Sequence, residues 1–205
     1  DIANKLIDMV EDLISMNHQK FYLVTSTKEA SLFPKEGIIG IALGMENGAP
    51  IQGDISRVKY FYDRGIRYIT LTHSKSNHIS DSSYDFNILW GGLSNFGKEL
   101  IKEMNRVGIM IDISHVNDDA FYQAIEISET PVIASHSSLR YFTPGFERNV
   151  SDDMLFKLLL EKSLPTKSEP KKSTPCKFLF EKSLLAKSFL VNKTVCFVLL
   201  LITFF

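Results

Sequence analysis

The chain has 205 residues and a net charge of −1, which is enough sequence for one barrel-sized domain or slightly less. This balance hides a split, because residues 1–155 hold 14 basic and 21 acidic residues whereas residues 156–205 hold 9 Lys and 3 Glu. The acidic body argues against nucleic acid as a partner. Both cysteines, Cys176 and Cys196, lie in the second part, so thiol catalysis and a disulfide are excluded for the body.

Along the body, short β-branched apolar runs alternate with amphipathic stretches. The predicted helices are 3–17, a short one opened by Ser26, 54–64, 95–107, 117–128 and 151–161. The predicted strands are 21–24, 38–45, 67–72, 109–114 and 132–135. Continuous apolar runs of this length are typical of strands buried on both faces, and their alternation with helices favours an α/β fold with a parallel sheet.

Four of the apolar runs lead directly to a side chain that can bind a metal or polarise a carbonyl group. These side chains are Glu46, His73, His115 and His136. In a closed α/β barrel the C-terminal ends of the strands share one mouth, so the four are expected around one cavity. A single histidine at a strand end is more often a hydrogen-bonded polar residue. Three of the chain's five histidines at equivalent ends, together with one carboxylate, predict a site for zinc or a similar divalent ion.

The last fifty residues have a different character. Residues 157–164 are echoed at 177–184, a repeat with a period of 20 that is too short in total for a solenoid. The apolar end, 195–205, has 11 residues, whereas a membrane span needs about 20. Residues 163–205 are therefore predicted to be a basic, repeat-containing tail with an apolar end. It is expected to be helical or irregular, to make few contacts with the body and not to complete the barrel.

Six short motifs occur in order along the body. They are Gly44-Met-Glu-Asn-Gly48, Tyr68-Ile-Thr-Leu-Thr-His73, Gly91-Gly-Leu-Ser-Asn-Phe-Gly97, Asp112-Ile-Ser-His-Val116, Ser135-His-Ser-Ser138 and Glu147-Arg-Asn-Val-Ser-Asp-Asp153. Together they resemble the membrane (renal-type) dipeptidase family of zinc metallopeptidases over about residues 1–160. The resemblance implies a (β/α)8 TIM barrel, and about five of its eight βα units are expected within residues 1–162.

The resemblance also implies roles for individual residues in hydrolysis of dipeptides by a zinc-activated water. Glu46 matches the carboxylate that bridges two metal ions, and His115 and His136 match the histidines that complete one metal's shell. His73 matches the histidine that holds the scissile carbonyl oxygen, and Arg148 matches the arginine that grips the substrate carboxylate. A surface Arg148 paired with Glu147 or Asp152 is the alternative. Asp112 is interpreted as a polar barrel residue or a partner of a ligand, not as a ligand.

Two elements of the family pattern are not found in this sequence. The second metal is held in the family by a His-x-Asp pair upstream of the bridging glutamate, and an aspartate near the end of the last strand transfers a proton. The chain is therefore expected to hold at most one zinc and to be an incomplete dipeptidase. The alternative is a non-catalytic remnant or interaction module with a weak residual metal site. A homodimer, and a membrane-associated or secreted location, are further implications of the resemblance.

Overall fold

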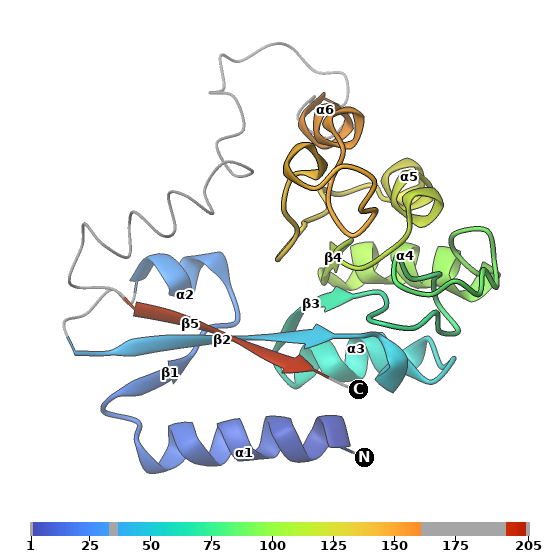
Figure 1. The fold of residues 1–205 in the computed structure, drawn as a ribbon. Helices are drawn as coiled ribbons and strands as arrows, with labels where there is room; N and C mark the ends of the chain where they lie inside the picture. Colours follow the sequence, from blue (N-terminus) through green and yellow to red (C-terminus); the bar gives the residue numbers. More distant parts are fainter. Residues whose placement is uncertain (1, 33–36, 161–195, 204–205) are drawn as a thin grey trace, which may run out of the picture.

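The computed structural model describes residues 2–32, 37–160 and 196–203. Its sheet is built from parallel strands in the sequential order β1-β2-β3-β4 (Figure 1). These strands are β1 (Phe21–Leu23), β2 (Ile39–Glu46), β3 (Ile66–Thr70) and β4 (Met110–Asp112). Because each parallel neighbour is reached through a crossover, all four strands end at the same edge of the sheet. The predicted α/β class with a parallel sheet is confirmed.

Helices separate the strands, as the alternation predicts. They are α1 (Ile2–Met16), α2 (Thr27–Leu32), α3 (Ser56–Asp63), α4 (Asn95–Val107), α5 (Asp118–Ile127) and α6 (Asp152–Leu160), with two short 3-10 turns, η1 (Ala49–Ile51) and η2 (Arg140–Phe142). Figure 1 shows α4, α5 and α6 on the β4 side of the sheet, whereas α1 lies on the side of β1. In the described part of the chain, no helix is long and apolar enough to cross a membrane.

The helix boundaries follow from local side-chain chemistry. Ser94 caps α4 by accepting a hydrogen bond from the Gly97 N–H, and Asn117 caps α5 by accepting from the Ala120 N–H. Gly108 ends α4 with a φ of 94°, a left-handed conformation that favours glycine. The cap at Ser26 is half of a capping box, because its hydroxyl accepts from the Glu29 N–H while the Glu29 carboxylate bonds Thr25 instead.

The fifth predicted strand, 132–135, is reduced to one parallel bridge between Ile133 and Asp112. The backbone of Ile133 exchanges hydrogen bonds with Ile111 and Ile113. Two residues further on, the N–H of Ser135 is donated to the Asp112 carboxylate at 3.0 Å instead of to a neighbouring backbone carbonyl. A side chain therefore ends the ladder where the sequence predicts a longer strand.

The core lies between the sheet and its helices and is formed by aliphatic and aromatic side chains. Leu43, Ile69 and Ile111 on the strands and Phe61 and Leu100 on the helices are completely buried. Strands that are apolar on both faces bury side chains on both sides of the sheet, which explains why their sequences are continuous apolar runs rather than alternating ones. This packing fixes the strand ends that carry the polar residues.

The end of the tail departs from expectation. Residues 196–203 form β5 (Cys196–Thr203), which pairs in parallel with β2 from Ile39 to Glu46. The expectation that this region makes few contacts with the body is therefore wrong for its apolar segment, whose β-branched and aromatic residues suit a strand. Residues 161–195, which include the end of the first copy of the repeat and all of the second, lie outside the described residues. The division into residues 1–162 and 163–205 remains a prediction.

Candidate metal centre

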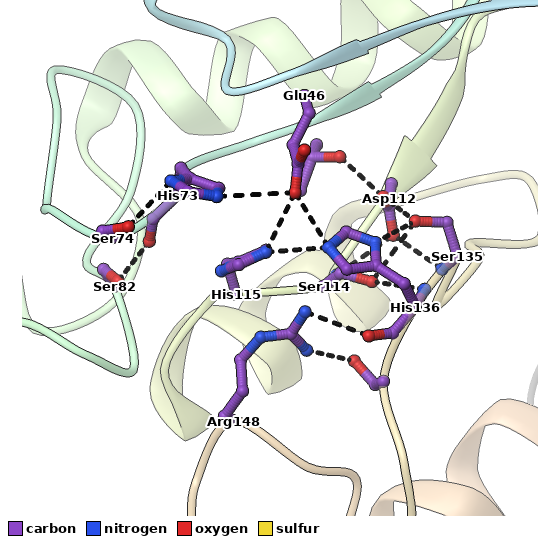
Figure 2. Close-up of polar contacts among 12 residues, drawn as sticks. Glu46, His73, Ser74, Ser82, Asp112, Ser114, His115, Ser135, His136 and Arg148 are labelled. Carbon is purple, nitrogen blue, oxygen red and sulfur yellow. Dashed lines mark hydrogen bonds and ion pairs between the residues drawn. The ribbon is translucent and has the colours of Figure 1, made fainter. Parts of the chain in front are cut away.

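Three predicted ligands meet beyond the C-terminal ends of the strands (Figure 2). Glu46 is the last residue of β2, His115 follows β4, and His136 follows the bridge at Ile133. The Oε1 atom of Glu46 lies 3.1 Å from His115 Nε2 and 2.9 Å from His136 Nε2, and the two Nε2 atoms are 2.8 Å apart. Within the described residues, these three form the group with the ligand types and spacing of a metal site.

The geometry of this triangle fits a small divalent cation. Ligand atoms 2.0–2.1 Å from a tetrahedral ion lie about 3.3 Å apart, close to the three separations observed here. Two imidazole nitrogens and a carboxylate oxygen at such distances direct lone pairs at one another, so a proton or a cation must lie among them. One carboxylate with two imidazoles is a donor set that suits zinc.

His115 is held in a state and an orientation that suit a ligand. Its side chain is 8% exposed, and burial, with nearby Arg148, His73 and His136 adding to the effect, lowers its pKa to about 4. The imidazole is therefore neutral at pH 7, the form that binds a metal. Its backbone has a φ of 74°, an unusual conformation for a residue with a side chain. The Nδ1 atom is buried and has no hydrogen-bond partner in the described structure.

His73, which follows β3, stands beside this cluster. Its Nε2 atom lies 3.6 Å from Glu46 Oε1, and its ring is 4.4 Å from the ring of His115. The Nδ1 atom is 2.8 Å from Ser74 Oγ. If that hydroxyl donates its proton, the ring proton resides on Nε2, which is the nitrogen that faces the cluster in Figure 2.

Arg148 approaches the cluster from the other side (Figure 2). Its guanidinium donates to Ser137 Oγ at 2.8 Å and to the His136 carbonyl at 3.0 Å. The residue is buried, and this burial lowers the pKa of its guanidinium. The alternative of a surface arginine paired with Glu147 or Asp152 does not fit this placement.

The long loop between β3 and α4 fixes the backbone around the site. Ser82 Oγ donates to the His73 carbonyl at 2.5 Å, and both the N–H and the hydroxyl of Ser83 donate to the His115 carbonyl. The loop is anchored by the buried carboxylate of Asp81, which accepts backbone hydrogen bonds from Leu89, Trp90 and Gly92. The loop is therefore part of the scaffold that positions both histidines.

Two features of the site have little signal in the sequence. Tyr84 packs between the two sides of the mouth, with ring centroids 5.9 Å from His115 and 5.7 Å from Phe146. Ser135 contacts both Asp112 and His136. Serines are common in this chain, so only the position of Ser135 next to His136 in the sequence could have suggested its role. Nothing in the sequence places Tyr84 beside His115.

Known proteins share this arrangement of elements. The sequence profile of "Membrane dipeptidase (Peptidase family M19)" matches residues 2–164. An uncharacterized dipeptidase from Schizosaccharomyces pombe is 37% identical over 155 residues, which cover 74% of this chain and 37% of that protein. Dipeptidase 3 of Rattus norvegicus is 34% identical over 160 residues, covering 75% of this chain and 31% of that protein. The chain thus spans about a third of the length of these relatives.

Solved structures agree with this result. An amidohydrolase from Pseudomonas aeruginosa superimposes with a TM-score of 0.69 at 31% identity, over 75% of this chain and 46% of that chain. A metallo peptidase from Rhodobacter sphaeroides, solved with a phosphinate mimic of the dipeptide L-Ala-D-Ala, gives a TM-score of 0.63 at 26% identity, over 73% of this chain and 44% of that chain. From its sequence and its fold, the chain belongs to the membrane dipeptidase family, peptidase family M19.

Proposed function

We propose that this chain carries one zinc site of a metal-dependent dipeptidase, formed by Glu46, His115 and His136. The observation that supports this most strongly is the triangle of one carboxylate oxygen and two imidazole nitrogens, with sides of 2.8–3.1 Å, at the C-terminal edge of the parallel sheet. When bound, zinc supplies a Lewis acid and lowers the pKa of water so that a nucleophile exists at neutral pH. At most one such ion is expected in this chain, because the sequence does not contain the His-x-Asp pair upstream of Glu46.

His73 is proposed to steady the scissile carbonyl. An Nε2–H that faces the cluster can donate to a substrate carbonyl oxygen at the open side of the cluster, and this bond strengthens as the oxygen gains negative charge. The Ser82 hydroxyl bonds the main-chain carbonyl of His73, and Ser74 Oγ contacts the Nδ1 of its ring. Together they hold the ring in place before substrate binds. The ring therefore needs little rearrangement when the oxygen gains charge, and a donor that is already in position stabilises this charge most effectively.

Arg148 is proposed to bind the C-terminal carboxylate of a dipeptide. Two of its hydrogen-bond partners, Ser137 Oγ and the His136 carbonyl, are uncharged. Burial lowers the pKa of the guanidinium more than any single neighbour raises it, although Tyr84, Asp112 and Glu46 all act in the opposite direction. An incoming carboxylate would therefore add compensation to a guanidinium whose burial is unfavourable. The planar fork suits a carboxylate bidentately. Arg148 would thus select peptides whose C-terminal carboxylate lies close to the cleaved bond. Dipeptides, the substrates of a dipeptidase, have this property.

Zinc titration of the purified chain tests the metal site. We expect one tightly bound zinc, lost on substitution of His115 by alanine and retained on substitution of His18 by alanine. His18 is an exposed histidine outside the cluster, so it controls for unspecific binding by imidazole. Equal zinc binding by the two variants would contradict the assignment. Dipeptide hydrolysis by the chain is expected to be far weaker than that of a complete relative, and robust turnover that depends on His115 would show this expectation to be wrong.

The roles of His73 and Arg148 are tested in a form of the enzyme with a complete barrel. Arg148→Ala should mainly raise KM, because a remote carboxylate is bound in both the ground state and the transition state. His73→Ala should mainly lower kcat, because the negative charge on the oxygen develops only near the transition state. If a C-terminally amidated dipeptide is cleaved as fast as the free acid, Arg148 does not bind the substrate carboxylate.

A further inference from the structure

A buried carboxylate lies behind the cluster, at the end of β4. Asp112 is completely buried and accepts four hydrogen bonds, two on each oxygen. Its Oδ1 accepts from the N–H groups of Ser114 and Ser135, each at 3.0 Å. Its Oδ2 accepts from Thr70 Oγ1 at 2.6 Å and from Ser135 Oγ at 2.5 Å. One side chain thus joins β3, β4 and the segment that carries His136.

Ser135 connects this carboxylate to one of the proposed ligands. Its Oγ lies 2.5 Å from Asp112 Oδ2 and 2.7 Å from His136 Nδ1 (Figure 2). A hydroxyl has a single proton, and a carboxylate with four donors around it can only accept. The Ser135 proton therefore points to Asp112, and the Ser135 oxygen accepts from the Nδ1–H of His136. With the proton on Nδ1, the Nε2 lone pair of a neutral ring faces Glu46 and His115.

We infer that Asp112, acting through Ser135, fixes the proton of His136 on Nδ1 and thereby presents its Nε2 as a metal ligand. Both residues are positioning residues, since neither is part of the triangle of ligand atoms. The inference rests on the proposed zinc site. A hydrogen bond to the second nitrogen commonly fixes the tautomer and ring orientation of a ligating histidine, and here a serine hydroxyl is inserted between the carboxylate and the ring.

The chain of hydrogen bonds from Asp112 through Ser135 to His136, called the relay below, acts on the more exposed of the two histidines. The His136 side chain is 30% exposed, whereas that of His115 is 8% exposed, so His136 is the less confined of the two. Three described hydrogen bonds outside the cluster hold it: its N–H donates to Ser114 Oγ, its carbonyl accepts from Arg148, and its Nδ1 bonds Ser135. Among these three, the Ser135 contact alone reaches the ring.

Thr70 provides a matched control within the same hydrogen-bond group. Its hydroxyl donates to the same Asp112 oxygen as Ser135 does, but the described hydrogen bonds of Thr70 do not include His136. Replacement of Thr70 by valine removes a buried hydrogen bond of the carboxylate without touching the relay. A purely structural role of Asp112 predicts similar effects of Thr70→Val and Ser135→Ala, whereas the relay predicts that only Ser135→Ala affects His136.

The first readout is the protonation of the His136 ring, measured by nitrogen-15 NMR in the 205-residue chain without added metal. In the wild type we expect Nδ1 to carry a proton, whatever the state of Nε2. In Asp112→Asn the side-chain amide can donate to Ser135 Oγ, which frees the Ser135 proton to bond Nδ1. The neutral ring is then expected to carry its proton on Nε2. An unprotonated Nδ1 in the wild type, or an unchanged tautomer in Asp112→Asn, would overturn the inference.

The second readout is zinc affinity, measured by competition with a chelator. Loss of a partner of this kind weakens metal binding on the order of 10–100-fold, and we expect this for Ser135→Ala and Asp112→Asn. Thr70→Val should bind zinc as the wild type does, and Ser135→Thr, which keeps the hydroxyl, should restore most of the affinity. Equal losses in Thr70→Val and Ser135→Ala would refute the relay. If the wild type bound no zinc, the proposed site would fail, while the NMR result would still decide whether the relay exists.

Discussion

Gly44 lies where the β2 backbone meets an aromatic ring, so it has no room for a side chain. A Cβ atom at this position would lie 2.1 Å from Cε1 and Cζ of Tyr68 and 2.6 Å from its hydroxyl. Gly44 and Tyr68 are paired neighbours on β2 and β3, and Tyr68 is 2% exposed. The test substitution is Gly44→Ala, which adds one methyl group to a buried face two residues before Glu46.

The expected loss of stability follows from the overlap between the new methyl group and the Tyr68 ring. Carbon atoms in contact are normally about 3.5–4.0 Å apart, so the ring and the new methyl group would have to separate by about 1.5 Å. Overpacking of a core typically costs about 1–3 kcal/mol, and a rigid buried ring places this case near the upper value. For a body of this size, about 3 kcal/mol corresponds to a decrease in Tm of roughly 6–12 °C. Because the strain lies next to Glu46, zinc affinity should fall as well.

The measurement is urea and thermal unfolding of the wild type and of Gly44→Ala, followed by circular dichroism. The double variant Gly44→Ala with Tyr68→Leu removes the ring that causes the clash. Its loss of unfolding free energy should be smaller than the sum of the losses in the two single variants, because the two positions are in contact. An alanine variant as stable as the wild type, or a double variant without this coupling, would refute the reasoning.

Three further predictions concern the site and its scaffold. Since the pKa of His115 is about 4 in the folded chain and about 6.5 when unfolded, the unfolded state binds more protons between these values. The metal-free protein should lose about 2 kcal/mol between pH 7.5 and pH 5, and urea unfolding should show a smaller loss in His115→Gln. Asn117→Ala removes the α5 cap and should cost about 1 kcal/mol in the same assay, whereas Asn117→Asp should not. Asp81→Asn places a donor against backbone N–H groups, so hydrogen exchange at Leu89, Trp90 and Gly92 should accelerate; unchanged protection would show that the loop is held otherwise.

The sequence predicts those parts of the fold that depend on local chemistry and on burial. The strand that leads to Glu46 and the helix at 95–107 are examples, because the hydrophobic pattern that marks each of them is local in the sequence. The strand predicted at 109–114 is shorter than expected and ends at Asp112. The convergence of Glu46, His115 and His136 was also predictable, given a parallel sheet. Their roles as ligands remain a proposal.

Other features depend on contacts between distant residues, which a single sequence does not reveal. The strand predicted at 132–135 ends early because Asp112, more than twenty positions upstream, takes the N–H of Ser135. The partner of Gly44 is visible only once Tyr68 is placed beside it. The pairing of β5 with β2 joins residues more than 150 positions apart, and the composition of the tail predicted the opposite.

The separation of the proposed ligands along the chain bears on the order of folding. Glu46 and His115 are 69 positions apart, and His115 and His136 are 21 apart. Glu46 ends β2, His115 follows β4 and His136 follows the bridge at Ile133, so the cluster can form only after the crossovers have closed and these segments have paired. A slip of one residue in the register of β2 would turn Glu46 to the opposite face of the sheet. Zinc therefore cannot act as a local nucleus in refolding. It would bind after the slow non-local pairing of the sheet and stabilise only the correct register, so the rate of zinc uptake should report completion of the sheet while helix formation runs ahead of it.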